Sequence, residues 1–499
     1  MNCIAVIGAG VMGRGIAQIS AAAGYRVKVF DVGPDRASAG VEFAAGMLRR
    51  AAEKGQLSAA DAEAAAARLE VCAELAQLRD ADLVIEAAAE NLEIKQKLFS
   101  DLEAIVADDA ILATNTSSLV VTQIASGCRR PQRMAGLHFF NPVPLMKLVE
   151  IIPGVLTEQS VVERLTAFVS RIGHGSVLAA DTPGFLVNHA GRAFYTEGVR
   201  VVGEGVADVV DVDRVAKEAL GFRMGPFELF DLTGLDVSYH VLTRIYHQYF
   251  EEPRYRPHPL LTRQFAAGLY GRKNGRGFYV YEKGTRVEPP EPAFVDGDER
   301  ALWIADRGDD GRRLQETLAK HDIRIDEGDQ PDGQSVIVLV PYGLDATTAA
   351  VRQGLPLERC MALDMMVWPV ERITIMPTVA TRADCRDSLH AMLGRRGLAV
   401  TRIHDSAGFI SQRLLASIVN LACDIAQQRI ATPADIDRAV RLGLGYPKGP
   451  LAWGDEIGPR RILEILENLL DFYGDPRYRP SPWLKRRALG GVPLSTPDP

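Results

Sequence analysis

A glycine-rich segment near the amino terminus limits what this chain can fold into more than any other feature of its sequence. Residues 3–7 form a short, wholly apolar run, and Gly8, Gly10 and Gly13 follow at the spacing of a dinucleotide-binding turn. The next residues favour a helix, and a second strand-like run ends at Asp31. Three glycines alone are a weak signal, but this strand–turn–helix–strand context with a terminal acid is what such a turn requires. The sequence therefore predicts a doubly wound α/β domain of the Rossmann type.

Each glycine has its own physical role in such a turn. Gly8 permits the tight turn, Gly10 lets the backbone approach a pyrophosphate, and Gly13 lets the helix pack closely on the strand. Asp31 is placed to accept hydrogen bonds from ribose hydroxyls and would repel a 2′-phosphate, so NAD is expected rather than NADP. A strand–turn–helix without a ligand, and Asp31 as a simple turn residue, remain as alternatives. Cofactor contacts are expected from Gly8, Gly10, Val11, Met12, Gly13 and Asp31.

The order of strand-like and helix-like segments divides the chain into four predicted domains. Residues 36–79 are rich in alanine and charge and predict two long helices. Residues 134–140 and 147–152 predict neighbouring parallel strands, and the proline-rich stretch 283–297 predicts a linker. The domains are an α/β domain (1–182), an all-α domain (183–285), a degenerate α/β domain (298–403) and a second all-α domain (404–495).

The second half of the chain repeats the first in one constant register. Residues 181–185 (DTPGF) match 405–409 (DSAGF). The same register pairs 211–213 with 435–437, and 221–226 with 445–450. Chance does not produce such a register, so we interpret the helical domain as duplicated.

The middle of the chain, 299–400, has the outline of a shortened α/β domain. Asp306, Gly308 and Gly311 stand there in place of the three glycines of the first domain. Because the Asp306 carboxylate would obstruct the turn and repel phosphate, we expect no second dinucleotide site.

Composition and charge exclude several classes of protein. The chain has 499 residues, 47% of them hydrophobic and 24% charged, with a net charge of −7, which is typical of a globular protein without an affinity for nucleic acid or membrane surfaces. We expect no targeting peptide before the first strand, and no apolar run reaches the roughly 18 residues that a membrane span requires. The six cysteines lack the spacing of a metal or redox site. We therefore expect a cytoplasmic enzyme that binds no metal.

His138 and Glu150 are the strongest candidates for acid–base chemistry. Oxidation of an alcohol needs a group that takes the hydroxyl proton, and histidine titrates near working pH. His138 comes just after one apolar strand, and Glu150, twelve residues later, lies at the end of the next, so two neighbouring parallel strands could bring them together. A buried carboxylate beside an imidazole orients the ring. The alternatives are a core histidine and an ordinary strand-end acid.

Two further polar segments follow buried strands or open a helix. Residues 114–118 (TNTSS) come after a strand at the carboxyl edge of the sheet, where ligands lie in doubly wound folds, although serine and threonine are also frequent helix N-caps. Asn188 opens the first helix of the second domain, where a surface amide is the alternative.

Together these segments resemble the 3-hydroxyacyl-CoA dehydrogenase family. The matching strings are 8–13 (GAGVMG), 85–91 (IEAAAEN), 115–118 (NTSS), 136–144 (GLHFFNPVP) and 181–188 (DTPGFLVN). The likeness runs from residue 1 to about 281, and the string around His138 is highly specific. The two-copy length is similar to the long bacterial form associated with phenylacetate breakdown, which implies 3-hydroxybutyryl-CoA or 3-hydroxyadipyl-CoA as substrate, oxidised with NAD.

The resemblance implies a role for each matching residue. His138 would be the general base, polarised by Glu150, while Ser117 and Asn188 would hold the oxygen on C3 of the substrate. The implied residues around the substrate and cofactor are Asn141 in the substrate network, Glu90 and Lys95 near the NAD ribose and nicotinamide, and Asn115 near the nicotinamide ring. Basic residues of the helix after the second strand would meet the CoA phosphates, and the candidates are Arg49, Arg50 and Lys54.

The second copy departs from this pattern. Gln412 replaces Asn188, Thr374 replaces Glu150, and Asp364 aligns with His138 when a small gap is allowed. We therefore expect a catalytically empty second half that completes the substrate domain. In shorter relatives two such helical domains meet by dimerisation, so the internal copy could replace part of a homodimer contact.

Other functions compete with this interpretation. A β-hydroxyacid dehydrogenase acting on a free acid, of the 3-hydroxyisobutyrate, 6-phosphogluconate or gulonate type, opens with a similar glycine turn. A non-catalytic NAD-binding protein is the other alternative.

Overall fold

The computed structural model describes residues 1–293 and 297–498, and these form two compact units. The first unit comprises residues 1–189 together with 428–444, and the second comprises 190–427 together with 445–499. The first unit is therefore formed by two separate segments of the chain. Part of the predicted linker, 294–296, lies outside the described residues.

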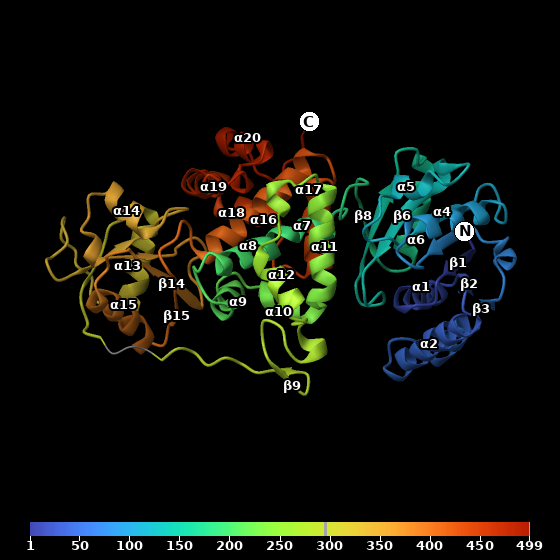
Figure 1. Ribbon diagram of the computed structural model, residues 1–499, viewed down its shortest axis with the longest axis horizontal. Helices are drawn as coiled ribbons and strands as arrows, with labels where there is room; N and C mark the ends of the chain where they lie inside the picture. Colours follow the sequence, from blue (N-terminus) through green and yellow to red (C-terminus); the bar gives the residue numbers. More distant parts are fainter. Residues whose placement is uncertain (294–296, 499) are drawn as a thin grey trace. The chain divides into compact units, whose positions relative to one another are not determined.

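The first unit is built on an eight-stranded sheet in the order β3-β2-β1-β4-β5-β6-β7-β8 (Figure 1). Its strands are β1 (Cys3–Ile7), β2 (Arg26–Phe30), β3 (Leu69–Cys72), β4 (Leu83–Glu86), β5 (Ile111–Thr114), β6 (Met134–Phe139), β7 (Leu148–Pro153) and β8 (Gly175–Leu178). Alternate residues of β1 enter two different apolar clusters, Ile4 and Val6 on one face and Ala5 and Ile7 on the other. The sheet is thus buried on both faces, as a doubly wound domain requires.

Helices flank this sheet, beginning with the one that follows the glycine turn. Its helices are α1 (Val11–Ala22), α2 (Pro34–Glu53), α3 (Ala59–Ala66), α4 (Leu92–Glu103), α5 (Val121–Ala125), α6 (Gln159–Arg171) and α7 (Val187–Ala190). The prediction of two long helices over 36–79 was wrong in part. Only α2 is long, and Leu69–Cys72 is an edge strand paired with β2 in parallel. The extended conformation of Leu69–Cys72 depends on pairing with β2, and the local alanine-rich pattern does not reveal that pairing.

The strands β6 and β7 are antiparallel, and the prediction of a parallel pair was wrong. The physical reason is the short connection between them, residues 140–147, because a parallel pair needs a crossover of a dozen or more residues. The antiparallel register places His138 directly opposite Glu150.

A helix from the last part of the chain belongs to the first unit. This helix, α17 (Pro433–Leu444), packs on β7 and β8. The Ala180 N–H, just after β8, donates a hydrogen bond of 2.8 Å to the Ile430 carbonyl, and Arg438 donates to the Ser176 carbonyl. The last two strands of this sheet are therefore contacted by a segment that lies in the second half of the sequence repeat.

The second unit holds the remaining helices and a smaller sheet. Its helices include α8 (Arg192–Gly203), α9 (Val209–Glu218), α10 (Pro226–Thr233), α11 (Leu235–Gln248), α12 (Pro259–Ala266), α16 (Ile410–Gln427), α18 (Pro450–Ile457), α19 (Pro459–Tyr473) and α20 (Pro482–Gly490). The His404 N–H donates a hydrogen bond of 2.9 Å to the Val206 carbonyl. In the register of the repeat, His404 corresponds to Ala180 and Val206 to Ile430, so this bond has the same form with the two halves of the chain exchanged.

The sheet of the second unit has five strands in the order β11-β12-β13-β14-β15. The strands are β11 (Leu302–Ile304), β12 (Val336–Leu339), β13 (Cys360–Leu363), β14 (Arg372–Pro377) and β15 (Ala399–Arg402), with α13 (Asp309–Lys320), α14 (Ala346–Arg352) and α15 (Ala383–Arg395). Where the α/β outline would place a second strand after α13, the chain forms only one isolated bridge, between Leu302 and Ile325. In the register of the repeat, β14, α15 and β15 begin and end at the positions that correspond to β7, α6 and β8. β13 and β14 are antiparallel like β6 and β7.

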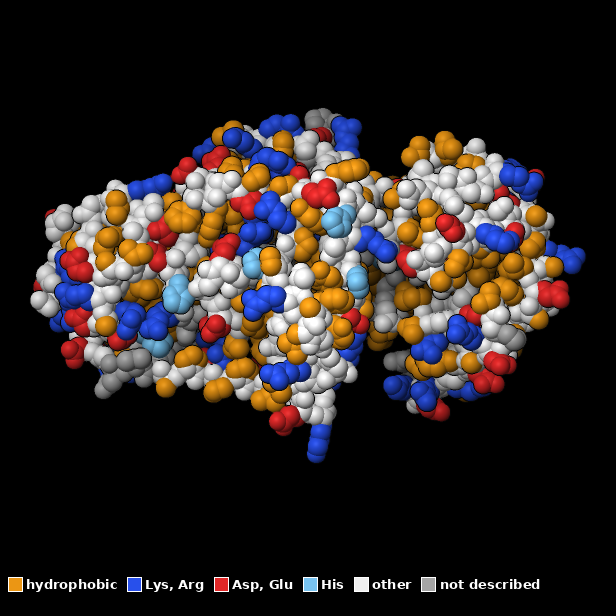
Figure 2. Space-filling model, in the orientation of Figure 1, with side chains coloured by type: hydrophobic (Ala, Val, Ile, Leu, Met, Phe, Trp, Pro, Cys, Tyr) orange, Lys and Arg blue, Asp and Glu red, His pale blue; other side chains and the backbone are white. Residues whose placement is uncertain are grey.

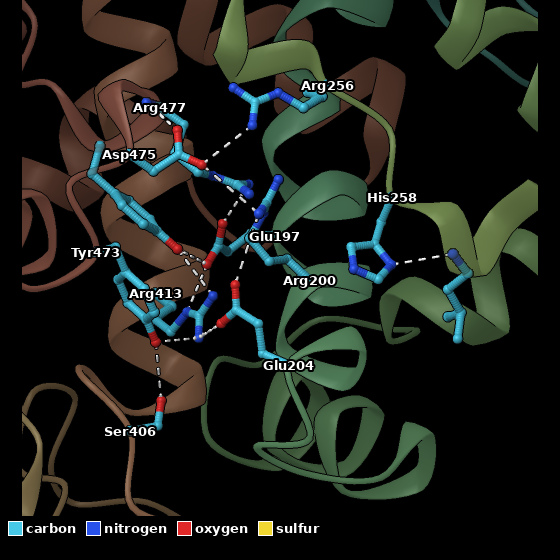
Figure 3. Close-up of polar contacts among 12 residues, drawn as sticks. Glu197, Arg200, Glu204, Arg256, His258, Ser406, Arg413, Tyr473, Asp475 and Arg477 are labelled. Atoms are coloured by element: carbon cyan, nitrogen blue, oxygen red, sulfur yellow. Dashed lines mark hydrogen bonds and ion pairs between the residues drawn. The ribbon is translucent and has the colours of Figure 1, made fainter.

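Buried charges link helices from the two halves of the chain within the second unit (Figure 3). Glu197 of α8 is fully buried and accepts from Arg413 Nε of α16 at 2.6 Å and from Arg477 Nη2 at 2.7 Å. Arg413 also contacts Glu204 at 2.8 Å. Burial raises the pKa of Glu197, but the two arginines outweigh it and hold that pKa below its usual value.

The described surface is mixed in charge. On the face shown in Figure 2, basic and acidic side chains are interspersed. Within the described ranges, the helices lack the combination of length and apolar character that crossing a bilayer demands.

Candidate active site

The glycine turn has the geometry that its sequence predicts. Gly8 has φ +93°, and a Cβ there would lie 2.5 Å from the Ala87 carbonyl oxygen. A Cβ on Gly13 would lie 1.7 Å from the Gly8 carbonyl oxygen, so helix α1 packs directly on the turn. A Cβ on Gly10, in contrast, meets no atom within 4 Å. Two glycines therefore permit close packing of the protein on itself, and Gly10 faces open space at the N-terminus of α1, where a pyrophosphate fits.

Asp31 lies beside this turn at the end of β2. Its Oδ2 accepts a hydrogen bond of 2.8 Å from the Ala9 N–H, and its Oδ1 accepts one of 3.1 Å from the Gly33 N–H. A carboxylate offers about four acceptor positions, so these two bonds leave capacity for ribose hydroxyls. Its negative charge at this place disfavours a 2′-phosphate.

Lys95 is enclosed among carboxylates after β4. Its side chain is 1% exposed, and its Nζ lies 2.5 Å from Oε1 of the buried Glu86 and 3.4 Å from Oε2 of Glu90. Thr114 Oγ1 donates to the other Glu86 oxygen at 2.6 Å. Sequence reasoning missed Glu86, although an acid at the end of a buried strand was a signal. The Glu86–Lys95 pair joins β4, α4 and β5, and direct contact of Lys95 with the cofactor stays a prediction.

Glu90 organises the loop that follows β5. It accepts hydrogen bonds from Thr116 Oγ1 at 2.6 Å and from the Ser117 and Ser118 N–H groups at 3.1 Å each. Burial raises the pKa of Glu90, but these donors and the Lys95 ammonium outweigh it and keep the pKa below its usual value. The loop holds Ser117 at the surface beside this acid.

The structure brings His138 and Glu150 together. His138 Nδ1 lies 2.6 Å from Glu150 Oε2, and the two side chains are nearly or fully buried. Glu150 Oε1 accepts hydrogen bonds from the Leu186 N–H at 3.0 Å and the Val187 N–H at 2.7 Å. An ionised carboxylate only accepts, so the proton of the shared bond belongs to Nδ1. The Nε2 atom of a neutral ring is then the free base.

A strained turn aims the two N–H groups at Glu150. Gly184 has φ +77° and Phe185 φ +48°, and a phenylalanine in this left-handed region is held there against a steric cost of about 1–3 kcal/mol. In the second half, α16 begins at Ile410, and Phe409 is not in the left-handed region. The strain is therefore confined to the copy that carries the histidine and the glutamate.

Asn115 contacts the strand that carries His138, the Phe140 ring lies near the imidazole, and Asn188 follows a residue that binds Glu150. Asn115 Oδ1 accepts a hydrogen bond of 2.8 Å from the Phe139 N–H, which ties the end of β5 to the strand of His138. Asn188 is half-buried and follows Val187 directly in α7. The Phe140 ring lies 4.6 Å from the imidazole, centroid to centroid. Asn115, Asn188 and the His138–Glu150 pair are thus assembled within the first unit.

A cavity of about 410 Å³ lies between α1, α2 and the loop after β6. Apolar side chains such as Phe43, Met47 and Leu145 line it, together with Asn141, Arg14, Gln18, Arg50 and Lys54. Two of the predicted CoA-phosphate candidates, Arg50 and Lys54, therefore share this cavity with Asn141.

One basic residue that was predicted to contact CoA does not line the cavity, and another that was not predicted does. Arg49 does not line it and instead pairs with Glu63 at 2.7 Å on the surface. Sequence reasoning missed Arg14, whose guanidinium lies 3.8 Å above the Phe43 ring. Its position in the first turn of a helix that opens a phosphate site was the available signal.

The corresponding turn of the second unit is filled by its own side chain. Asp306 Oδ1 accepts from the Gly308 N–H at 3.0 Å and Oδ2 from the Gly311 N–H at 2.6 Å. A Cβ on Gly311 would lie 1.9 Å from the Asp306 carbonyl oxygen, which repeats the relation of Gly13 to Gly8. The Asp306 carboxylate thus occupies the N–H groups that would otherwise face a phosphate.

In the second unit, Asp364 stands at the position that corresponds to His138. Asp364 follows β13, and its carboxylate accepts from Ser411 Oγ and, at 3.0 Å, from Gln412 Nε2. Burial raises the pKa of Asp364. A second Gln412 bond reaches the Pro341 carbonyl at 3.0 Å. These contacts form a closed polar cluster between β13 and α16.

A glycine turn that admits a dinucleotide, an acid beside it, and a buried imidazole–carboxylate pair define the class: an NAD-dependent dehydrogenase. Comparisons with known proteins agree. The model of "3-hydroxyacyl-CoA dehydrogenase, NAD binding domain" matches residues 3–182, and that of "3-hydroxyacyl-CoA dehydrogenase, C-terminal domain" matches 184–281 and 408–492. The chain belongs to the 3-hydroxyacyl-CoA dehydrogenase family.

Some relatives match nearly the whole chain, and others match only its first half or so. The chain is 36% identical to the 3-hydroxyadipyl-CoA dehydrogenase of Escherichia coli (strain K12), over 98% of each chain. It is 41% identical to a probable 3-hydroxybutyryl-CoA dehydrogenase of Bacillus subtilis (strain 168), over 56% of this chain and 98% of the relative. Among solved structures, that of a 3-hydroxybutyryl-CoA dehydrogenase from Escherichia coli K12 has a TM-score of 0.86 and 33% identity, covering 98% of each chain.

Proposed function

We propose that this enzyme oxidises the hydroxyl group of (S)-3-hydroxyacyl-CoA to the 3-ketoacyl-CoA, with a short chain such as 3-hydroxybutyryl or 3-hydroxyadipyl. The observation that carries this proposal is the buried contact of 2.6 Å between His138 Nδ1 and Glu150 Oε2, which leaves Nε2 as the base. Bound NAD⁺ supplies the hydride acceptor of this reaction. The similarity to dehydrogenases named for both substrates supports this chain-length class.

The chemistry assigned to the protein is proton transfer and orientation. His138 Nε2 takes the proton from the C3 hydroxyl, and Glu150 stabilises the imidazolium that forms. Ser117 and Asn188 hold the C3 oxygen near that nitrogen. Glu150 is itself fixed by two backbone donors, so its charge is oriented before the substrate arrives.

The cavity between α1 and α2 is the proposed place of the CoA portion. It joins apolar side chains to Arg14, Arg50 and Lys54, a combination that suits a phosphate-bearing thioester with an organic arm. Asn141 lines the same cavity three residues after His138, so it leads from the proposed CoA site toward the base. Arg49, paired with Glu63, takes no part in this proposal.

The second half is proposed to be a degenerate copy that replaces a partner subunit. The four-domain division (1–182, 183–285, 298–403, 404–495) is kept as part of this proposal. Its support is the reciprocal pair of backbone hydrogen bonds, Ala180 to Ile430 and His404 to Val206, which have the pattern of a twofold interface within one chain.

The buried Glu197–Arg413 pair makes that internal interface one-sided. In the register of the repeat, Glu197 corresponds to Leu421 and Arg413 to His189, and these two residues cannot form the same ion pair. Two copies of the first half would therefore bury Glu197 without the Arg413 guanidinium, although Arg254 stands at the position of its other partner, Arg477, when a one-residue slip is allowed. This asymmetry favours pairing of the first helical copy with the second, and a homodimer through other surfaces is compatible with it.

A substrate panel tests the proposed function. The purified protein is incubated with NAD⁺ and either (S)-3-hydroxybutyryl-CoA, 3-hydroxyadipyl-CoA or the corresponding free hydroxy acids, and NADH absorbance is followed. Turnover confined to the thioesters supports the proposal, and turnover of the free acids would favour a β-hydroxyacid dehydrogenase. Equilibrium binding should give one NAD per chain, because Asp306 fills the second turn, and two sites would contradict an empty second half.

A further inference from the structure

The search for unassigned function leads to helix α17, which the repeat assigns to the second half but which lies in the first unit. It runs along β7 and β8, held by the Ala180–Ile430 backbone bond and by Arg438 on the Ser176 carbonyl. β7 is the strand that carries Glu150. Helix α17 carries none of the proposed catalytic groups, yet it packs against β7, the strand that carries Glu150.

Gly443, near the end of α17, makes the closest approach. A Cβ placed on it would lie 2.9 Å from Val187 Cγ1 and 3.0 Å from Leu148 Cδ2. Both neighbours are completely or almost completely buried. A Cβ contact of 2.9 Å essentially does not occur, and one of 3.0 Å is tighter than nearly all real contacts, so any larger residue at 443 must shift Val187, Leu148 or the helix itself.

Both neighbours of Gly443 belong to the segments that hold Glu150. The Val187 N–H donates the 2.7 Å hydrogen bond to Glu150 Oε1, and Leu148 lies two residues before Glu150 on β7. Glu150 Oε2 in turn contacts His138 Nδ1 at 2.6 Å. Only Val187 and Glu150 separate Gly443 from the imidazole.

We infer that Gly443 is a positioning residue for the His138–Glu150 pair, supplied by the half of the chain that lacks a base–acid pair of its own. The inference rests on the proposed function of that pair. The position that corresponds to Gly443 in the first half is Ala219, so the repeat itself does not demand glycine here. The second half thereby takes part in the reaction through close packing, and it is more than a scaffold for the substrate domain.

Gly443→Ala tests this inference. Alanine favours a helix over glycine, but its Cβ must push Val187 or Leu148 aside; a role in packing alone therefore predicts a changed stability with a normal kcat. A positioning role predicts that kcat falls about 10- to 100-fold, because small displacements of catalytic groups have effects of that size. The KM for NAD⁺ should stay within about twofold, since the glycine turn is untouched. Gly490→Ala is the matched control, because a Cβ in that helix meets only Val492 Cγ2, at 3.7 Å.

A compensating change makes the test specific. Val187→Ala removes the two Val187 methyl groups that the new Cβ would meet and leaves only Leu148 Cδ2, the far end of a flexible side chain, near it. Gly443→Ala in that background should therefore lower kcat by less than about twofold relative to Val187→Ala alone. Equal losses in both backgrounds would overturn the inference, as would a folded Gly443→Ala enzyme with normal kcat.

A spectroscopic measurement separates this inference from the proposed function. In protein labelled with ¹⁵N-histidine, the Nδ1–H proton that His138 shares with Glu150 should shift or broaden in Gly443→Ala and remain unchanged in Gly490→Ala. An unchanged signal in Gly443→Ala would overturn the positioning role, whatever substrate the enzyme uses. Failure of the wild-type enzyme on every acyl-CoA would instead reject the proposed function.

Discussion

Replacing Glu150 with glutamine probes the catalytic pair with a minimal change of shape. Glu150 has three contacts in the folded protein: Oε1 accepts from the Leu186 and Val187 N–H groups, and Oε2 lies 2.6 Å from His138 Nδ1. A glutamine can satisfy the two backbone donors only with its carbonyl oxygen, so its NH₂ group must face Nδ1. That group donates, and Nδ1 must then accept. The imidazole proton moves to Nε2, and the atom that should take the substrate proton already carries one.

The expected effect of Glu150→Gln is large and falls on kcat. Loss of general-base catalysis removes about 10²–10⁴-fold in rate, and a tautomer change of the same kind in a serine protease removes about 10⁴-fold. We expect about 10³-fold, equivalent to about 4 kcal/mol of transition-state stabilisation at 1.36 kcal/mol per factor of ten.

The assay for Glu150→Gln follows NADH formation from (S)-3-hydroxybutyryl-CoA with saturating NAD⁺, and circular dichroism checks the fold. The KM for NAD⁺ should change by less than about twofold, because Glu150 is remote in sequence from the glycine turn. A folded Glu150→Gln enzyme that keeps more than a tenth of the wild-type kcat would refute the assignment of the imidazole tautomer.

Four other substitutions, one of them a control, have distinct expected outcomes. Lys54→Glu should raise the KM for acyl-CoA at least about tenfold and leave that for NAD⁺ unchanged, whereas Arg49→Glu should alter neither constant, since Arg49 already pairs with Glu63 on the surface; equal effects of both would contradict the assigned cavity. Arg413→Leu leaves the buried Glu197 without one of its partners and should lower the free energy of unfolding by about 3 kcal/mol or more, measured by urea denaturation; a loss under about 1 kcal/mol would show that the network adds little. Glu90→Gln tests the acid dependence of stability. The folded-state pKa of Glu90 is lowered, so its stabilisation is present above the unfolded-state pKa and is lost as pH falls through the folded value. The variant should therefore be less stable than wild type at pH 7, and the difference should shrink as the pH falls below the ordinary glutamate pKa of about 4.3. A difference independent of pH would contradict the role of that charge.

Much of the candidate site could be predicted from short segments because its parts are local. The Gly8–Gly13 turn needs only a strand before it and a helix after it, and its geometry follows from steric limits on glycine. The pairing of His138 with Glu150 was predicted from two strand-end positions, and the structure confirms their contact. The predicted strand direction was wrong, and the short connection 140–147 was the observation that should have decided it.

The features that could not be predicted depend on contacts between distant parts of the chain. β3 is a strand because β2 lies beside it, and nothing in its own four residues requires that. Lys95 of α4 pairs with Glu86 at the end of β4, a contact between two elements that only the folded structure brings together. Gly443 is far from Val187 in the sequence, and its closeness to the Glu150 loop appears only when α17 is placed on the sheet. Such placements depend on tertiary packing, which no local pattern encodes.

The most direct test of the central claim is the rate at which His138→Ala oxidises (S)-3-hydroxybutyryl-CoA with NAD⁺. The His138–Glu150 assignment predicts that wild-type enzyme forms NADH, and that the folded variant, with NAD⁺ binding intact by equilibrium titration, loses at least about 10²–10⁴-fold in kcat. A folded His138→Ala enzyme with kcat within tenfold of wild type would contradict the claim that this imidazole is the base.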